Sequence, residues 1–324
     1  MNNNKSLRPI GRTGIMVTPI GLGCWQFSKR NNMAGRFWPS LEDDLIEKVV
    51  ALSIEGGINW FDTAEVYGNG ASENALSKAL QASGKKPGDV LIATKWWPAF
   101  RFASNISKTI NGRISTLDPY PIDLYQVHQP WSFSGEKSEM EAMAELVKRK
   151  LIKAVGVSNF NAQKMKNSWE TLQKSGIPLA SNQVRYNLLD RKIESNGVME
   201  LAKKLGITII AFSPLAQGLV SGKFHDNPGL LKNIGLRKYS TQFKPEGLEK
   251  SRPVIVLLKE LADKYSVTTS QVALNWLIHY NGDTVVAIPG ATKEIYVKEN
   301  SGAMSFRLSD EDMLRLDNVS SIFK

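Results

Sequence analysis

The chain has 324 residues, of which 42% are hydrophobic and 22% are charged. This balance is typical of a globular protein with a large buried core and excludes an intrinsically disordered chain. No stretch approaches the roughly 18 consecutive apolar residues of a membrane span, and the first residues lack the apolar segment of a signal peptide. We therefore expect a cytoplasmic protein that does not enter a membrane.

The charge is strongly basic, with 41 Lys and Arg against 31 Asp and Glu and a net charge of +10. Such a charge can favour nucleic acid, an anionic membrane or a phosphorylated small ligand. The basic residues are scattered and accompany no nucleic-acid-binding motif, so we expect a solvated basic surface and no nucleic-acid partner. One cysteine, Cys24, and three histidines argue against a disulfide and against a metal site.

The predicted β-strands begin with a short hairpin near the N-terminus. Residues 8–18 contain two short extended pieces around Gly-containing turns, which predicts an N-terminal hairpin at one end of the fold. Apolar runs then alternate with amphipathic segments, a pattern typical of parallel strands joined by crossover helices. Strands are predicted at 19–21, 58–61, 90–93, 124–127, 154–157, 180–183, 208–212 and 285–288. Because eight such units favour closure, we expect a single domain over 1–324 with an α/β, (β/α)8 TIM-barrel fold.

Helices are predicted where apolar residues recur at helical spacing, at 45–55, 73–82, 137–149, 162–174 and 195–205. Between Phe212 and Pro253 the unit spacing is interrupted, and loops of this length are usually functional or disordered. Two helices, 254–265 and 270–280, should precede the last strand. An appended C-terminal helix over 309–319 should begin at Ser309.

Candidate catalytic residues follow the predicted strands, whose C-terminal ends form the active-site face of a TIM barrel. The second, third and fourth strands run into Asp62, Lys95 and His128, and Tyr67 follows in the loop DTAEVYG. An ammonium group stabilises a phenolate, so we expect Lys95 to bring the pKa of Tyr67 closer to neutral. His128 could then hydrogen-bond a carbonyl oxygen while Tyr67 protonates the developing alkoxide. Helix capping by Asp62 and simple packing of Tyr67 are the structural alternatives.

Two common nucleotide-binding patterns are absent from the sequence. No G-x-G-x-x-G follows the first strand, so a Rossmann site is not supported. The segment GLVSGKF fails as a P-loop because its glycines are too close together and Phe224 replaces the Ser or Thr that meets magnesium. A nucleotide would have to bind in another way.

Motifs in order along nearly the whole chain carry a family resemblance: GLGCWQF, INWFDTAEVYG, LIATKWW, DLYQVHQPW, AVGVSNF, SNQVRYNLL, IIAFSPLAQGLVSGK and VVAIPGATKEIYVKEN. Together they resemble the motifs of the aldo-keto reductase family. The resemblance implies an NADP(H)-dependent oxidoreductase that reduces a small-molecule aldehyde or ketone. In it Tyr67 would be the general acid, tuned by Lys95 and Asp62, with His128 orienting the carbonyl. The assembly state, including a homo-oligomer, is left open.

The resemblance also implies the residues that hold NADP(H). Ser158, Asn159 and Gln183 match the positions that bind the nicotinamide carboxamide, and Phe212 matches the aromatic residue stacked on the ring. The stretch 213–223 resembles the loop that crosses the pyrophosphate, and Glu299 and Asn300 match adenine contacts. The full set is Gly23, Cys24, Trp25, Ser158, Asn159, Gln183, Phe212, Ser213, Pro214, Leu215, Gln217, Gly218, Lys223, Gly290, Thr292, Lys293, Glu299 and Asn300.

The choice between NADP(H) and NAD(H) depends on the 2′-phosphate. The arginine that many relatives use for this phosphate has no obvious counterpart here. Lys293 could replace it, although its ammonium group is a point charge that cannot form the two parallel hydrogen bonds of a guanidinium. We therefore expect NADP(H) to be preferred over NAD(H).

Four tryptophans lie just beyond strand ends and are predicted to line an apolar substrate pocket: Trp25, Trp96, Trp97 and Trp131. Core packing is the alternative for each of them. Two other functions remain open: an NADP(H)-binding regulatory subunit of the channel-associated type with slow turnover, and a TIM-barrel lyase with Lys95 as Schiff base. The lyase needs a lysine in an apolar setting and has no use for Tyr67.

Overall fold

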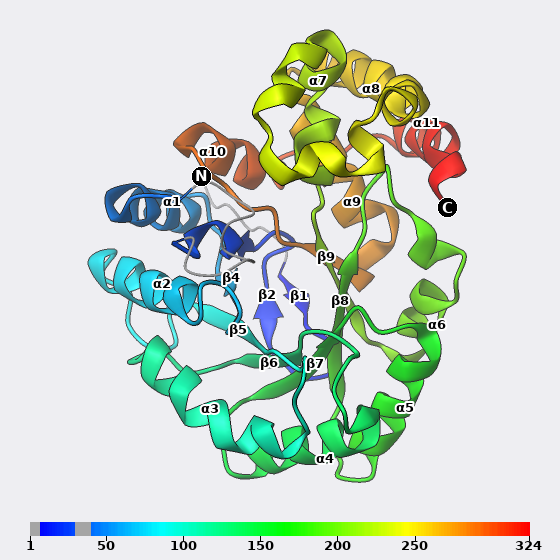
Figure 1. Ribbon diagram of the computed structural model, residues 1–324. Helices are drawn as coiled ribbons and strands as arrows, with labels where there is room; N and C mark the ends of the chain where they lie inside the picture. The colour runs from blue at the N-terminus through cyan, green and yellow to red at the C-terminus, as the bar shows by residue number, and fades with distance from the viewer. Residues whose placement is uncertain (1–6, 30–39) are drawn as a thin grey trace.

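The computed structural model describes residues 7–29 and 40–324. Eight parallel strands form one sheet in which each strand pairs with its neighbours along the chain. The sheet closes on itself because Gly21 N donates to Ala287 O and Ala287 N donates to Pro19 O, both at 2.9 Å. Figure 1 shows the resulting (β/α)8 barrel, which confirms the predicted fold class. The strands are β3 (Leu22–Gly23), β4 (Trp60–Asp62), β5 (Leu91–Trp96), β6 (Leu124–Val127), β7 (Ala154–Ser158), β8 (Leu179–Arg185), β9 (Thr208–Phe212) and β10 (Val285–Ala287).

Helices pack around the outside of the barrel (Figure 1). Several begin at side-chain caps: the hydroxyl of Thr268 accepts a hydrogen bond from Gln271 N, and the predicted cap Ser309 accepts one from Asp312 N. The helices are α1 (Asp43–Glu55), α2 (Ala71–Ala82), α3 (Ser104–Leu117), α4 (Gly135–Lys148), α5 (Ala162–Gln173), α6 (Val198–Leu205), α7 (Lys223–Asp226), α8 (Pro245–Tyr265), α9 (Thr269–Tyr280), α10 (Glu294–Gly302) and α11 (Asp310–Ser320). Within the described residues, no helix has the length and apolarity needed to cross a membrane.

The predicted hairpin is present as β1 (Arg8–Pro9) and β2 (Met16–Val17). Its residues Ile10 and Val17 belong to the apolar cluster that fills the barrel interior. Gly11 N donates to the hydroxyl of Thr208, at the start of β9, over 2.8 Å. Gly11 has φ +57°, and a Cβ there would lie 2.9 Å from the Cα of Ala180, so only glycine fits. The hairpin therefore covers the N-terminal end of the barrel, opposite the end where the sequence predicts the active site.

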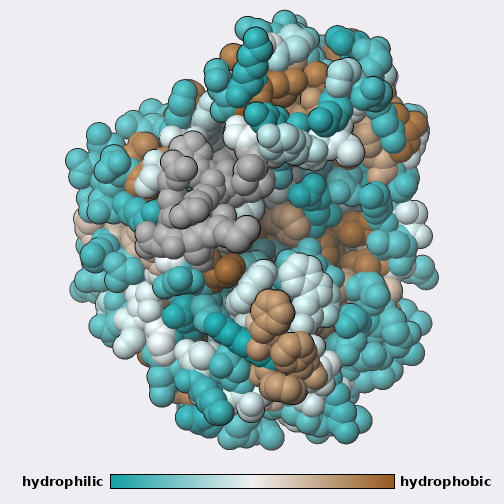
Figure 2. All heavy atoms as spheres, viewed as in Figure 1, coloured by the Kyte–Doolittle hydropathy of each residue, from teal (hydrophilic) through white to brown (hydrophobic). Residues whose placement is uncertain are grey.

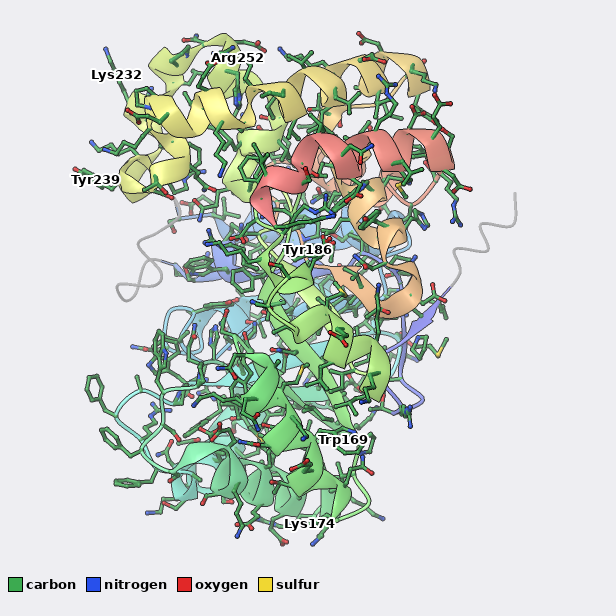
Figure 3. All side chains as sticks on the ribbon, turned by 90° about the vertical axis from the view of Figure 1, so that its right-hand side faces the viewer. Trp169, Lys174, Tyr186, Lys232, Tyr239 and Arg252 are labelled. Atoms are coloured by element: carbon green, nitrogen blue, oxygen red, sulfur yellow. The ribbon has the colours of Figure 1, made fainter. Side chains whose placement is uncertain are left out.

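The stretch between Phe212 and Pro253 is more regular than the sequence predicts. It contains short helical turns, η4 (Ala216–Ser221), α7, η5 (Pro228–Asn233), η6 (Gly235–Tyr239) and η7 (Thr241–Phe243). Helix α8 begins at Pro245 and continues through Pro253, so the predicted start at 254 was wrong. Pro253 removes one backbone donor, yet the helix continues because its buried face, including Leu248 and Val254, packs on the core. We call residues 216–265 the α7–α8 lobe, from which Lys232, Tyr239 and Arg252 extend in Figure 3.

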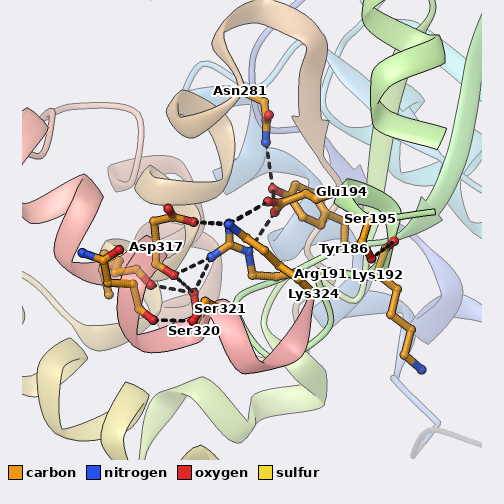
Figure 4. A network of polar contacts seen from close by, with 12 residues as sticks. Tyr186, Arg191, Lys192, Glu194, Ser195, Asn281, Asp317, Ser320, Ser321 and Lys324 are labelled. Atoms are coloured by element: carbon orange, nitrogen blue, oxygen red, sulfur yellow. Dashed lines mark hydrogen bonds and ion pairs between the residues drawn. The ribbon is translucent and has the colours of Figure 1, made fainter. Parts of the chain in front are cut away.

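A buried arginine joins the C-terminal end of the chain to the barrel (Figure 4). The guanidinium of Arg191 has no solvent exposure and donates two hydrogen bonds to Glu194, at 2.8 and 2.7 Å, and one to Asp317 O at 3.0 Å. Its carbon lies 4.8 Å from the ring centre of Trp276 and 5.1 Å from that of Tyr280. Because Asp317 lies in α11, this network fixes the appended helix against α9 and the β8–α6 connection.

Candidate active site

A cavity of about 980 Å³ lies at the C-terminal ends of the strands, under the α7–α8 lobe. Figure 2 shows this face of the molecule hollowed between the lobe at the top and a group of apolar side chains below the centre. Three of the four predicted catalytic residues line the cavity: Asp62, Tyr67 and His128. Lys95 is fully buried beneath them. Residues from three separate parts of the sequence, Asp62 with Tyr67, Lys95 and His128, therefore meet at one place.

Lys95 is held as an ammonium ion at the bottom of the cavity. Its Nζ forms an ion pair with Asp62 and donates to Thr63 O at 2.8 Å. Burial disfavours the charged lysine, but Asp62 and the hydroxyl of Tyr67 outweigh this effect and raise the pKa of Lys95. The lysine is therefore protonated at neutral pH.

Two glutamines fix the orientation of Asp62. Its Oδ2 accepts a hydrogen bond from Gln183 Nε2 at 2.8 Å and from Gln126 Nε2 at 3.2 Å, while its Oδ1 faces Lys95. Both glutamines are on strands, and both are buried. A carboxylate with these three contacts is satisfied although Asp62 is only 1% exposed.

Tyr67 lies against three of the other site residues. Its ring stacks on Trp25 with centroids 5.7 Å apart, and the ring of His128 meets it edge-on at 5.6 Å. Lys95 Nζ lies 5.0 Å from the centre of the Tyr67 ring. Burial raises the pKa of Tyr67 above its usual value, and Lys95 opposes this only in part. The prediction that Lys95 brings this pKa closer to neutral was therefore wrong, because burial outweighs the nearby charge.

His128 is a neutral imidazole at physiological pH. Burial, reinforced by the positive charge of Lys95, lowers its pKa well below the usual value. The edge of its ring meets Trp97 at 5.3 Å. A neutral imidazole carries one N–H, so His128 can donate a single hydrogen bond to a carbonyl oxygen.

Every residue that the sequence predicts for cofactor binding, from Gly23 to Asn300, lines the same cavity. Ser158, Asn159 and Gln183 lie together at the ends of β7 and β8: Asn159 Nδ2 donates to the Ser158 hydroxyl at 3.1 Å, and that hydroxyl donates to Gln183 O at 2.9 Å. Gln183 also donates to Asp62, so it joins the predicted nicotinamide site to the predicted catalytic residues.

Three basic side chains gather at the part of the cavity beneath the lobe: Lys223, Lys293 and Arg237. Burial and the charges of the other two lower the pKa of Lys223. Arg237 Nη1 donates to Gln217 O at 3.2 Å. A concentration of positive charge in a part-buried space favours a ligand with phosphate groups.

Unpaired polar atoms in the cavity wall also fit a nucleotide. Asn300 Nδ2 and Gln217 Oε1 are buried and have no hydrogen-bond partner in the described part of the chain. Unpaired buried polar atoms are costly, and a nucleotide base or ribose could satisfy them. Phe212 offers an aromatic face in the same cavity. The cavity therefore suits a dinucleotide in size, charge and polarity.

The tryptophans do not all lie where the sequence predicts. Trp25 and Trp97 line the cavity. Trp96 was wrongly expected there: it is fully buried among the helices and donates from Nε1 to Asn105 Oδ1 at 3.0 Å. Successive side chains of a strand point to opposite faces of the sheet. Because Lys95 points into the barrel, Trp96 must point away from it, which explains the error. Trp131 is not among the cavity-lining residues; it is 57% exposed and meets Trp97 edge-on at 6.0 Å.

Comparison with known proteins shows the family to which the chain belongs. The sequence pattern of the Aldo/keto reductase family matches residues 19–321. The chain belongs to this family. Membership supports an oxidoreductase activity on small-molecule carbonyl compounds.

Individual relatives agree with this assignment. The chloroplastic pyridoxal reductase of Arabidopsis thaliana is 31% identical over 318 residues, which covers 94% of this chain and 83% of the relative. A thermostable aldo-keto reductase solved with the inhibitor epalrestat is 29% identical with a TM-score of 0.77, covering 97% of this chain and 99% of that one. The glycerol dehydrogenase of Gluconobacter oxydans is 26% identical with a TM-score of 0.84, covering 98% and 96%.

This aldo/keto reductase contains site residues that the sequence analysis missed. Gln126 lies two residues before His128 on the same strand face, so period-two alternation could have revealed it. Arg185 lies two residues after Gln183 on the same strand face, and it lines the cavity. Arg237 gave no signal, because only the folding of the lobe brings it to the cavity.

Proposed function

We propose that the protein is an NADP(H)-dependent carbonyl reductase that converts an aldehyde or ketone to an alcohol, as a single barrel domain. The observation that supports this most strongly is the meeting of Tyr67, Lys95, Asp62 and His128 at the bottom of one cavity. An acid, a fixed ammonium group and a neutral imidazole at one point are what carbonyl reduction requires.

NADP(H) is the cofactor that the cavity fits best. When bound, it supplies the hydride that reduces the carbonyl carbon. Ser158, Asn159 and Gln183 would hold the nicotinamide carboxamide, with Phe212 against the ring. Lys223 and Arg237 would meet the pyrophosphate, and Lys293 the 2′-phosphate. These positive charges support a preference for NADP(H) over NAD(H).

Proton transfer belongs to Tyr67. Its raised pKa keeps the hydroxyl protonated until the carbonyl oxygen begins to gain negative charge. The Lys95 ammonium then stabilises the phenolate that proton donation leaves behind. His128, which is neutral, donates its N–H to the same oxygen and orients the carbonyl. Asp62, held by two glutamines, keeps Lys95 charged and fixed in place.

The contacts of Lys95 also argue against the Schiff-base lyase. A Schiff base requires an unprotonated amine, whereas this lysine is paired with Asp62 and has a raised pKa. The aromatic walls formed by Trp25 and Trp97 suit a carbonyl substrate with an apolar part. The cytoplasmic location and the assembly state stay predictions.

The test is NADPH oxidation, followed by nicotinamide absorbance, with a panel of aldehydes, ketones, sugars and pyridoxal. For Tyr67→Phe we expect kcat to fall by about 10² to 10⁴. The dissociation constant for NADPH should change less than about twofold, because that variant removes no cofactor contact. Tyr239→Phe is the matched control, since Tyr239 is 66% exposed on the lobe and does not line the cavity.

Two results would contradict the proposal. Full turnover by Tyr67→Phe would show that another group donates the proton. Tight NADPH binding by the unmodified protein without turnover of any carbonyl would favour the regulatory subunit.

A further inference from the structure

Arg185 occupies a position in the cavity to which the proposed reaction gives no role. It is the last residue of β8 and pairs with Phe212 of β9. Because side chains two residues apart on a strand share a face, Arg185 points to the same side as Gln183, about 6.6 Å farther along the strand. Gln183 binds Asp62 in the catalytic layer. Arg185 therefore lies one layer nearer the mouth, where a substrate extends beyond its carbonyl group.

The guanidinium of Arg185 has no acidic partner. It is half-buried, and no ion pair or side-chain hydrogen bond joins it to another residue within 7–29 or 40–324. The other ranges, 1–6 and 30–39, contain no Asp or Glu. The guanidinium lies over the ring of Phe212, whose centre is 5.9 Å from the guanidinium carbon. A partly desolvated cation without a carboxylate is costly unless a ligand supplies the negative charge.

The acidic side chains of the cavity also leave Arg185 without a partner. Among the described residues, the carboxylates that line the cavity are Asp62 and Glu299. Asp62 is neutralised by Lys95, and Glu299 lies in α10, on the side predicted for adenine. Neither is available to Arg185.

The other basic groups of the cavity have a different task. Burial lowers the pKa of Lys223, and the nearby charges of Arg237 and Lys293 lower it further, so the three basic groups lie close together. This cluster can account for the phosphates of a dinucleotide. Arg185 lies instead against Phe212, at the end of the cavity where reduction is proposed to occur. The phosphates of the cofactor therefore leave it unused.

We propose that Arg185 makes this protein selective for carbonyl substrates that carry an anionic group, a carboxylate or a phosphate. The inference rests on the proposed reductase function and names the substrate class for that site. The planar guanidinium would bind the anion through two parallel hydrogen bonds. The carbonyl would then face Tyr67 and His128, and the apolar part of the substrate would lie between Trp25 and Trp97.

The test compares substrates that differ in charge and little else. 4-Formylbenzoate is paired with its methyl ester, and glyceraldehyde 3-phosphate with glyceraldehyde, in NADPH oxidation assays. The measured quantity is the ratio of kcat/KM for the anionic over the neutral member of each pair. For at least one pair, we expect Arg185→Met to lower this ratio about 10- to 100-fold. Arg185→Lys should keep part of it.

A matched control removes one positive charge elsewhere. Arg149 is exposed at the end of α4, which leads into the N-terminal end of β7, away from the cavity. Arg149→Met should leave both ratios within about twofold. The carboxylate and phosphate pairs show which anion Arg185 prefers.

Three outcomes would overturn the inference. The ratios could stay unchanged in Arg185→Met, which would show that Arg185 does not sense the anion. Both members of each pair could lose activity equally, which would make Arg185 a cofactor contact or a structural residue. The unmodified protein could also show no preference for either anion.

A binding measurement separates failure of this inference from failure of the reductase function. If no carbonyl is turned over, the proposed function fails, and calorimetric titration of the NADP+-saturated protein with benzoate and benzamide still tests Arg185. Tighter binding of benzoate that disappears in Arg185→Met would support the anion site. Equal binding of the two ligands would reject it.

Discussion

Replacement of Lys95 by methionine should affect stability and catalysis through the same atoms. Methionine has nearly the volume of lysine, so the change leaves the packing of the barrel interior nearly intact and removes the ammonium group. Asp62 would remain at 1% exposure with its two glutamine donors and without its counter-ion. An unpaired buried carboxylate is strongly destabilising.

The expected loss of stability follows from the burial of the pair. Removing one partner of a buried ion pair costs about 3–5 kcal/mol in the free energy of unfolding. For 324 residues, an unfolding entropy of about 2.1 cal/mol/K per residue converts this to a fall in Tm of about 4–7 °C. We expect kcat to fall by about 10² to 10⁴ as well, because the Tyr67 phenolate loses its stabilising charge.

The double variant Asp62→Asn/Lys95→Met separates the two effects. Its neutral amide still accepts hydrogen bonds from Gln126 and Gln183, and no uncompensated charge remains. Equilibrium urea unfolding and calorimetry should show most of the stability recovered, while NADPH oxidation stays as low as in Lys95→Met. Lack of recovery, or a Lys95→Met protein as stable as the unmodified one, would refute the reasoning about the buried pair.

Two further predictions concern the cofactor and acid stability. Lys293→Met should raise the dissociation constant for NADPH about tenfold and that for NADH less than twofold, as measured by fluorescence titration; equal rises would remove Lys293 from the 2′-phosphate site. Burial would raise the pKa of Asp312 and Asp317, but hydrogen bonds, led by those from Lys264 and Lys324 respectively, hold both at about 2, below the ordinary 3.8. The folded state is therefore stabilised by these groups above about pH 4 and loses this contribution as the pH falls towards 2. Urea midpoints between pH 5 and 2 test the sign, and a midpoint that rises on acidification would contradict it.

The repeating pattern of the sequence predicts the barrel well, because each strand and most helices carry their own hydrophobic period. The errors lie where local composition hides that period. Helix α3 was missed because Gly112 and several Ser, Thr and Asn residues surround its buried face, which includes Ile106 and Ile110. Helix α10 was missed because few of its side chains are buried. The predicted helix began at 254, directly after Pro253, but Pro253 lies inside α8.

The candidate site was predictable to the extent that strand ends determine it. The meeting of Asp62, Tyr67, Lys95 and His128 follows from their positions in the barrel. The direction of the side chain at Trp96 also follows from strand alternation, once Lys95 is known to point inward. The hydrogen bonds that Gln126 and Gln183 donate to Asp62 could not be predicted from strand positions, because they depend on distances across the barrel.

The pKa of Tyr67 shows why the chemistry of the site needs the structure. The sequence places a positive charge beside the phenol, which favours the phenolate, but it does not give the depth of the cavity, which disfavours it. In the folded protein the second effect is larger. A raised pKa suits an acid catalyst, because the proton stays on Tyr67 until negative charge develops on the substrate oxygen.

The basic groups of the cavity lie on two different parts of the fold, the α7–α8 lobe and the barrel. The lobe brings Lys223 and Arg237 over the barrel mouth, while Arg185 remains on the barrel itself beside Phe212. The two groups of positive charge therefore belong to different parts of the fold. A ligand bound beneath the lobe is held partly by residues of the lobe, whereas an anion bound to Arg185 is positioned by the strand that also carries Gln183. Substrate selection and cofactor retention can thus change independently in this protein, and variants of the lobe should alter the second without altering the first.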